Sequence, residues 1–317
     1  MESETPRVPT EESAAEIAHV YFGTPPRRVA RFSTGISGYV YDVTTVTGVR
    51  FVVRIGTPDS RAQFAGARYW SRILRPLSVP LPELLGKGEL RGFPYLVLER
   101  LAGDDLGTVY SRLTGDDRRA LAGEVCRIQR IVHSLPQGKG FGYAYDDDGP
   151  FQDTWASVID RLLARSRARI EATRQVGTDP VDRVQRQARR FAAYLDSVRP
   201  TPFLDDTTTK NVIVHQGRLS GIVDVDWVCF GDPLFTVALT RTALLSMGES
   251  LDYTDYWCEL LELTPEQHEI IRFYTALFCV DFMSELGQRF NQAPVPPLPA
   301  DHLLRLETIL ADQLIDA

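Results

Sequence analysis

Apolar and polar residues alternate through much of the first hundred positions, in short runs separated by turn residues. Residues 29–32, 39–43 and 51–55 are rich in valine, isoleucine and aromatic side chains, which is typical of half-buried strands. The glycine-containing segment 33–38 joins the first two runs, and a Thr-Gly turn joins the second to the third. The sequence therefore predicts three successive antiparallel strands.

A helical pattern follows the third of these runs. Residues 62–77 carry apolar side chains at helical spacing and stop before Pro80 and Pro82, which cannot continue a helix. Two further apolar runs, at 84–86 and 93–98, complete a predicted sheet of about five strands. We expect the one helix to cover this small sheet.

The rest of the chain is mainly helical in pattern, apart from two short β runs flanking a turn. Thr264 and the Pro265 that follows it form a helix-start signal for a long apolar helix reaching about residue 290. The other predicted helices cover 105–113, 116–134, 151–175, 180–197 and 301–315, and the β runs cover 212–214 and 219–223.

The 317 residues therefore divide into two parts of different character, and this length is ordinary for about two domains. We predict an α+β fold of two lobes. Residues 1–98 would form an N-terminal lobe built on a small antiparallel sheet, and residues 104–317 a mostly helical C-terminal lobe. Residues 99–103 would form the hinge between them.

Composition narrows the possible partners and location. The net charge of −7 argues against a nucleic-acid partner, which needs a basic surface. No run of 18 apolar residues is present, and the first nine residues lack the apolar core of a secretory signal. The four cysteines are scattered singly and form no zinc-binding pattern. We expect a cytoplasmic protein with no membrane partner.

One segment concentrates residues that carry chemistry. Asp206 and Asn211 bracket a polar loop that leads into a strand, and Asp224 ends the returning β run. This layout places the three side chains around one spot. Transfer of a phosphoryl group from ATP requires a residue that orients a hydroxyl nucleophile and oxygen ligands that hold Mg²⁺. An aspartate and an asparagine five residues apart, followed by a second aspartate, supply these groups.

With these residues the sequence resembles the aminoglycoside phosphotransferase and choline kinase-like family, which shares the protein-kinase fold. The resemblance extends over roughly residues 25–315. It implies that Asp206 accepts the proton of the substrate hydroxyl and that Asn211 and Asp224 bind the metal. Gly231-Asp232-Pro233 matches a further segment of the family, although Asp232 has a plain alternative role in capping the next helix.

The resemblance also indicates how the nucleotide, ATP or GTP, is held. Gly35, Ser37 and Gly38 match the phosphate-covering loop, where glycine lets the backbone approach phosphate closely, although an ordinary hairpin turn would look similar. The hinge around Glu99 and Leu101 would bind the purine through its main chain, so ATP and GTP are not distinguished.

Three departures from the family pattern stand out. Leu204-Asp205-Asp206 replaces the usual His-Gly-Asp, although Leu204 could still anchor the loop by packing. The cation of the third strand must be Arg54, because no lysine precedes position 87, and its guanidinium can hold phosphate oxygens. The helix that follows has no acidic residue from Gln63 to Leu74 to pair with that cation, so Gln63 or a main-chain carbonyl would have to substitute.

Two other side chains near the catalytic segment have candidate roles. Lys210 lies inside the catalytic loop, where it could hold the γ-phosphate and partly compensate for the missing glutamate; a solvated loop lysine is the alternative. Asp226 shares a strand face with Asp224 if the strand continues, so we expect a supporting carboxylate, a third metal contact or a substrate contact.

The last third of the chain is strongly acidic. Residues 201–317 contain 18 acidic and 6 basic side chains. Asp281 and Glu285 share one face of an apolar helix, where carboxylates are costly unless exposed or paired with charge. We expect them to help hold a cationic acceptor, as the resemblance to antibiotic kinases implies, while a solvated acidic surface is the alternative.

Two hypotheses from different classes follow. The first is a small-molecule kinase that moves the γ-phosphate of ATP or GTP, with Mg²⁺, to a hydroxyl of an amine-bearing, polyhydroxylated acceptor such as an aminoglycoside or related antibiotic. The second is a nucleotide-binding pseudokinase or regulatory module, suggested by the missing helix glutamate and the altered His-Gly-Asp. The joint presence of Asp206, Asn211 and Asp224 favours the enzyme.

Overall fold

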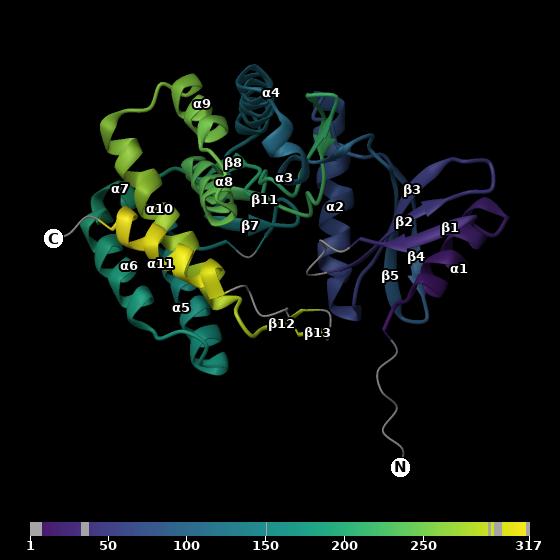
Figure 1. Ribbon diagram of the computed structural model, residues 1–317, viewed down its shortest axis with the longest axis horizontal. Helices are drawn as coiled ribbons and strands as arrows, with labels where there is room; N and C mark the ends of the chain where they lie inside the picture. Colours follow the sequence, from purple (N-terminus) through teal and green to yellow (C-terminus); the bar gives the residue numbers. More distant parts are fainter. Residues whose placement is uncertain (1–7, 33–37, 150, 291–292, 295–299, 315–317) are drawn as a thin grey trace, which may run out of the picture.

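The computed structural model describes residues 8–32, 38–149, 151–290, 293–294 and 300–314. In this part of the chain a small sheet lobe lies beside a larger helical lobe, as Figure 1 shows. The predicted α+β class, with an antiparallel N-terminal sheet and a mostly helical C-terminal lobe, is confirmed.

The N-terminal sheet has five antiparallel strands in the order β1-β2-β3-β5-β4. Along β3 the side chains alternate: Phe51, Val53 and Ile55 are buried in one core, whereas Arg54 faces the opposite side. The strands are β1 (Arg28–Arg31), β2 (Tyr39–Thr44), β3 (Arg50–Ile55), β4 (Leu84–Leu90) and β5 (Phe93–Glu99). The five-stranded prediction is thus confirmed.

A helix that the sequence analysis did not predict covers the core-forming face of this sheet. Helix α1 (Glu11–Phe22) begins with a capping box. The side chain of Thr10 accepts from the Ser13 amide, and the side chain of Ser13 accepts from the Thr10 amide. Its short apolar stripe of Ala14, Ile17 and Ala18 packs against the sheet. The expectation of a single covering helix was therefore wrong.

The predicted helix after β3 is present as α2 (Arg61–Leu74), extended by a short 3₁₀ turn to Leu77. Figure 1 shows α2 between the sheet and the helical lobe. Trp70 and Leu74 join a core that includes Val132 and Ile222 of the C-terminal lobe, so α2 is packed against both lobes.

The C-terminal lobe is built around an aromatic core in which Phe235 meets Trp155 and Tyr274 at ring-centroid distances of 5.2 and 5.3 Å. Its helices are α3 (Leu106–Val109), α4 (Gly115–His133), α5 (Trp155–Thr173), α6 (Asp179–Arg190), α7 (Ala192–Ser197), α8 (Leu234–Met247), α9 (Asp252–Leu260), α10 (Pro265–Ser284) and α11 (Ala300–Gln313). Helix α10 ends earlier than predicted, and β12 (Arg289–Phe290) pairs with β13 (Ala293–Pro294) beyond it.

Two three-stranded sheets in this lobe position the polar loops. One has the order β10-β9-β6 and the other β7-β11-β8. Because β8 and β11 are antiparallel neighbours, with Phe203 opposite Cys229, the loop that follows β8 and the loop that precedes β11 start from the same end of that sheet. The strands are β6 (Asp104–Asp105), β7 (Gly142–Ala144), β8 (Thr201–Phe203), β9 (Val212–His215), β10 (Arg218–Ile222) and β11 (Val228–Gly231).

Two further findings concern the cysteines and the length of the helices. All four cysteines are buried and free. Among the described residues, no helix has both the length and the apolar character needed to span a membrane.

Candidate active site

The two loops at the end of the β8–β11 pair bring together Asp206, Asn211 and Asp224, as predicted from their spacing. The side-chain amide of Asn211 donates to the main-chain oxygen of Asp206 (3.1 Å), and the Val223 amide donates to the Asn211 carbonyl (2.9 Å). We call residues 204–211 the catalytic loop and residues 223–227 the metal loop. The backbone bond between the loops fixes Asp224 beside Asp206.

The side chain of Gln129 in α4 anchors the catalytic loop. The Gln129 side chain accepts from the Leu204 amide (3.1 Å) and donates to the Leu204 carbonyl (2.8 Å), so it occupies both main-chain groups of one buried residue. Leu204 itself packs in the core, as the sequence analysis expected. Sequence reasoning missed Gln129, although a glutamine among the apolar positions of α4 was a signal for a buried polar role.

A row of threonines continues this support. Thr207 and Thr236 share a buried hydroxyl hydrogen bond (3.0 Å), and Thr240 donates to the Thr207 carbonyl (3.4 Å). Thr208 donates to Asp206 Oδ1 (2.7 Å), which orients that carboxylate. The Thr240 hydroxyl thus satisfies one buried main-chain group of the loop, and the other hydroxyls fix its side chains.

Asp205 and Asp206 have different surroundings. Asp205 is buried and accepts from the Trp227 indole (2.9 Å). Burial, with a smaller contribution from Asp206, raises the pKa of Asp205 to about 8. Asp206 is partly exposed, and loss of solvent raises its pKa too, against the lowering effect of the Thr208 bond. A carboxylate with a raised pKa and an open side is suited to accept a proton.

Asp224 stands at the open side of the metal loop. Its φ of 63° is left-handed, and its side chain is 43% exposed. The Arg54 guanidinium lowers the pKa of Asp224, whereas partial loss of solvent and the carboxylates of Asp226 and Asp206 raise it, and the net shift is upward. The strand does not continue here, so the expectation that Asp224 and Asp226 share a strand face was wrong.

The donors present fit a magnesium ion bound jointly with nucleotide phosphates. Among the described residues, no three His, Cys, Asp or Glu side chains gather as a self-sufficient metal site. Asn211 uses its amide nitrogen within the protein, which leaves its side-chain oxygen available to a ligand. Mg²⁺ needs only one or two protein oxygens when phosphates and waters complete its shell.

Arg54 lies under the metal loop, held by two carboxylates. Its two terminal nitrogens donate to the two oxygens of Asp226, each at 2.6 Å, and one also contacts Asp224 at 2.8 Å. Gln63 of α2 donates to Asp226 at 2.5 Å. Burial lowers the pKa of Arg54, but Asp224 and Asp226 raise it by more. The carboxylate partner of Arg54 therefore comes from the metal loop, and Gln63 binds that carboxylate rather than the cation.

Gly66 explains how α2 approaches this loop. An added Cβ at Gly66 would lie 2.2 Å from the Asp226 carbonyl oxygen and 2.8 Å from the Tyr145 ring. Only a residue without a side chain fits between the helix and the loop at this point.

Two residues of the predicted hinge, Glu99 and Leu101, differ in how their main-chain groups are used. The Glu99 amide donates to the Glu83 carbonyl (2.8 Å), and its carboxylate accepts from the Glu83 amide (3.1 Å), so Glu99 ties β5 to the segment before β4. The Leu101 amide has no hydrogen-bond partner among the described residues, whereas its carbonyl accepts from Arg100 (2.5 Å). The Leu101 amide is thus one of the hinge donors that no described residue occupies.

The predicted phosphate-covering loop is described only at its end. Gly35 and Ser37 lie outside the described residues. Gly38 adjoins Arg54, since an added Cβ there would lie 3.9 Å from the Arg54 Nε. Beside Arg54 and the metal loop, a narrow cavity lies between α2, β5 and the hinge side of the sheet, and its lining includes Ala67, Ser71, Leu96 and Leu98.

The carboxylates predicted on the acceptor side differ in their pairing. Asp281 accepts from Arg165 at 2.9 and 3.0 Å and from Ser166 at 3.1 Å, so its charge is already compensated inside the protein. Asp281 is therefore not the uncompensated carboxylate that the sequence analysis expected. Glu285, just past α10, makes no side-chain hydrogen bond or ion pair with the described residues.

Charged groups on several elements, including Lys210 of the catalytic loop, act on Glu285. Burial and Asp281 raise the pKa of Glu285, while Arg169, Lys210 and Arg165 lower it in part. Lys210 is exposed and also lowers the pKa of Asp206. Lys210 therefore lies within electrostatic reach of both the predicted base and the free carboxylate, on the open side of the catalytic loop.

Asp232 belongs to neither loop and accepts three hydrogen bonds at the start of α8. It accepts from the hydroxyls of Tyr194 (3.0 Å) and Tyr274 (2.9 Å) and from the Leu234 amide (3.0 Å) at the start of α8. The capping alternative for Asp232 is thus present, and the same carboxylate joins α7 to α10.

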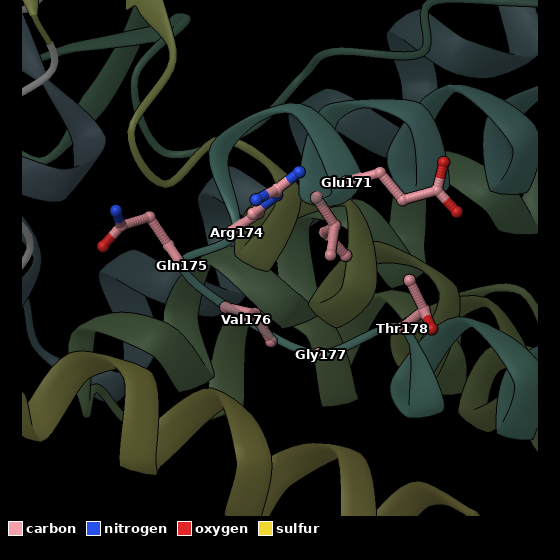
Figure 2. Close-up of a pocket in the computed structure, with 7 residues that line it drawn as sticks. Glu171, Arg174, Gln175, Val176, Gly177 and Thr178 are labelled. Carbon is pink, nitrogen blue, oxygen red and sulfur yellow. The ribbon is translucent and has the colours of Figure 1, made fainter.

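A second hollow lies at the turn between α5 and α6, shown in Figure 2. The side chains of Glu171 and Gln175 extend to opposite sides of it, and Arg174 ends α5 in a left-handed conformation. It contains none of Asp206, Asn211 or Asp224.

A small antiparallel sheet joined by a hinge to a helical lobe, with an Asp…Asn loop facing an Asp loop, defines a phosphotransferase of the protein-kinase-like class. Residues 28–269 match the phosphotransferase enzyme family, and the chain belongs to that family. The resemblance inferred from the sequence is confirmed. No curated protein sequence matches the chain significantly.

Solved structures with the same fold cover nearly the whole chain. An aminoglycoside phosphotransferase, APH(4)-Ia, in ternary complex with AMP-PNP and hygromycin B is 19% identical, with a TM-score of 0.67 over 94% of this chain and 98% of its own. The amicoumacin kinase hAmiN, solved with AMP-PNP, Ca²⁺ and Ami, is 14% identical, with a TM-score of 0.68 over 99% and 96%. A putative fructosamine-3-kinase from Thermobifida fusca is 16% identical, with a TM-score of 0.62 over 95% and 97%.

Proposed function

We propose that the protein transfers the γ-phosphoryl group of ATP or GTP to a hydroxyl of a small, amine-bearing, polyhydroxylated acceptor. The observation that carries this proposal is the joint placement of Asp206, Asn211 and Asp224 by two loops from neighbouring strands. We assign residues 1–98 to the nucleotide-covering lobe, 99–103 to the hinge, and 104–317 to the catalytic and acceptor lobe. We place the reaction in the cytoplasm, where nucleoside triphosphates are abundant.

In this mechanism Asp206 orients the acceptor hydroxyl and accepts its proton. The Thr208 bond to Oδ1 fixes the carboxylate and leaves Oδ2 for the hydroxyl. Asn211 and Asp224 would hold Mg²⁺, which supplies neutralisation of phosphate charge. Arg54 approaches the phosphates from the sheet side, and the Leu101 amide and Glu99 carbonyl meet the purine. AMP-PNP in the related structures supports ATP as donor.

The acceptor proposal rests on Glu285 rather than on Asp281. Glu285 is a partly buried carboxylate without a hydrogen-bond or ion-pair partner among the described residues, within electrostatic reach of Lys210 in the catalytic loop. An ammonium group of the acceptor would compensate its charge. The acceptors in related structures, hygromycin B and Ami, support an antibiotic-like molecule.

The test is Mg²⁺-dependent nucleotide turnover against a panel of amino sugars, amino alcohols and nucleoside antibiotics. Asp206→Asn should abolish transfer while nucleotide affinity stays near the wild-type value, because the base acts in the transition state. Asp160→Asn, an exposed change on α5, is the matched control and should keep full activity. Transfer that survives Asp206→Asn would remove Asp206 from the mechanism.

One observation favours the second candidate, a nucleotide-binding protein without transfer activity. The guanidinium of Arg54 is already engaged by Asp226 and Asp224, so phosphates must compete for it. Nucleotide binding without turnover across the whole panel would support this candidate.

A further inference from the structure

A buried ion pair joins the two lobes underneath the metal loop. Arg54 of β3 and Asp226 of the metal loop meet fork to fork, with side chains only 9% and 2% exposed. Two parallel charge-assisted hydrogen bonds fix the plane of the guanidinium as well as its position. Gln63 donates to Asp226 from α2, so three separate elements define the orientation of one arginine.

The two carboxylates around Arg54 are not equivalent. Asp226 is enclosed and contacts both terminal nitrogens, whereas Asp224 makes one contact and is 43% exposed. If Asp224 turns to a magnesium ion, Arg54 loses that contact but keeps Asp226. Because an unpaired buried charge is strongly unfavourable, only the enclosed carboxylate can keep Arg54 compensated in both arrangements.

The donor count of Arg54 supports the same division. A guanidinium has five N–H groups, of which Asp226 takes two. The remaining donors include the one that contacts Asp224 and the Nε on the side of Gly38. Asp226 does not use these donors, so they are the ones that phosphates could take once Asp224 turns to the metal.

We propose that Asp226 is the positioning residue that holds Arg54 in place for the nucleotide phosphates, with Gln63 fixing the Asp226 carboxylate. The metal loop thereby supplies the charge that α2, without an acidic residue from Gln63 to Leu74, does not contain. Asp224 is left free to exchange between Arg54 and the metal. This role rests on the proposed phosphoryl transfer, and it assigns Asp226 to the arginine rather than to magnesium or acceptor.

The experiment removes the carboxylate from the metal loop and introduces one on α2. Asp226→Asn keeps the shape and removes the charge, and it should lower kcat/KM for ATP about 100-fold, the effect expected of a group displaced by about 1 Å. The acceptor KM should not change. Adding Gln63→Glu to Asp226→Asn restores one carboxylate beside Arg54 from the other side, and it should recover at least tenfold of the loss. Gln63→Glu alone should lower activity, since it places a third carboxylate around one arginine.

Two further variants provide a control and a fallback measurement. Asp42→Asn removes the carboxylate partner of Arg50, an ion pair between β2 and β3 on the exposed part of the same sheet, and should leave kcat/KM unchanged. Gln63→Met removes only the donor to Asp226 and should lower kcat/KM for ATP about threefold to tenfold. It provides the measurement if Asp226→Asn does not fold, as judged by thermal melting.

Three results would overturn the proposal. The first is a wild-type kcat/KM for ATP in folded Asp226→Asn or, where that variant does not fold, in Gln63→Met. The second is a double variant whose kcat/KM is no better than that of Asp226→Asn. The third is an Asp226→Asn defect that excess Mg²⁺ repairs, which would make Asp226 a metal ligand. If the wild-type protein transfers phosphate to no acceptor, the proposed function fails separately. The same variants are then compared by calorimetric binding of ATP with Mg²⁺, where equal affinities would overturn the role of Asp226.

Discussion

Gly66→Ala adds one methyl group at the closest approach between α2 and the metal loop. The new Cβ would lie 2.2 Å from the Asp226 carbonyl oxygen, whereas real Cβ contacts stay beyond 3.0 Å. The nearest atom is main chain, so the helix and the loop must separate by about 1 Å, a displacement that can cost about 100-fold in rate. We expect this loss in kcat/KM for ATP, because Gln63 and Asp226 move apart together with their backbones.

The effect of Gly66→Ala on stability should be much smaller than its effect on activity. Alanine gains up to about 1 kcal/mol over glycine inside a helix, which offsets part of an overpacking cost of about 1–3 kcal/mol. A net loss of about 1 kcal/mol in urea denaturation is expected. A small change in stability together with a large change in activity would locate the damage in the site rather than in the fold.

Gly123→Ala on α4 is the matched control for this experiment. An added Cβ at Gly123 meets no atom within 4 Å, so only the helix-propensity gain remains. Steady-state kinetics at varied ATP, with both variants purified and shown to be folded, is the assay. If Gly66→Ala keeps wild-type kcat/KM, the close contact between α2 and the metal loop is not needed for activity and the reasoning is refuted.

Three further predictions concern the catalytic loop. Asp205 has a folded pKa of about 8 against 3.8 unfolded, so the folded state binds the extra proton and the free energy of unfolding falls as pH rises between those values. Asp205→Asn, which keeps the acceptor for Trp227, should flatten this dependence and stabilise the protein more at pH 8 than at pH 5; parallel melting curves would contradict it. Gln129→Met leaves both main-chain groups of Leu204 without the Gln129 side chain as a partner. The free energy of unfolding should therefore fall by about 2–4 kcal/mol in urea denaturation. A loss below about 1 kcal/mol would show that water replaces the amide. Lys210→Ala should lower kcat roughly tenfold with little change in nucleotide KM, as expected for a charge used in the transition state, and an unchanged kcat would leave Lys210 as a solvated loop residue.

Periodicity in the sequence predicted most of the elements because their burial is one-sided. Burial alternates cleanly along β2, and α2 and α4 carry apolar stripes at helical spacing. Helix α1 was missed because its buried stripe contains two alanines, which are weakly apolar, within a segment that also carries Glu11, Glu12 and Glu16. Its capping box at Thr10 and Ser13 was the available signal.

The placement of the catalytic residues followed from short-range order along the chain, whereas the partners of Arg54 did not. Asp206, Asn211 and Asp224 are connected by one loop and one hairpin, so their proximity is a local consequence of chain geometry. Arg54 and Asp226 are 172 positions apart, and no periodicity relates them. The turn that aims Asp226 inward also depends on the left-handed conformation of Asp224, an uncommon choice for a residue other than glycine.

The pairing of Arg54 with Asp226 also affects the order in which the molecule can be completed during synthesis. The N-terminal strands emerge from the ribosome first, with Arg54 on a sheet face that has no acidic partner on α2. The carboxylates that compensate it arrive only after about the first half of the helical lobe, through β10, has been made. A contact of such sequence separation forms late, since the closure of a long loop must precede it. The nascent sheet lobe must therefore keep this guanidinium hydrated, and the final closure of the two lobes coincides with its desolvation.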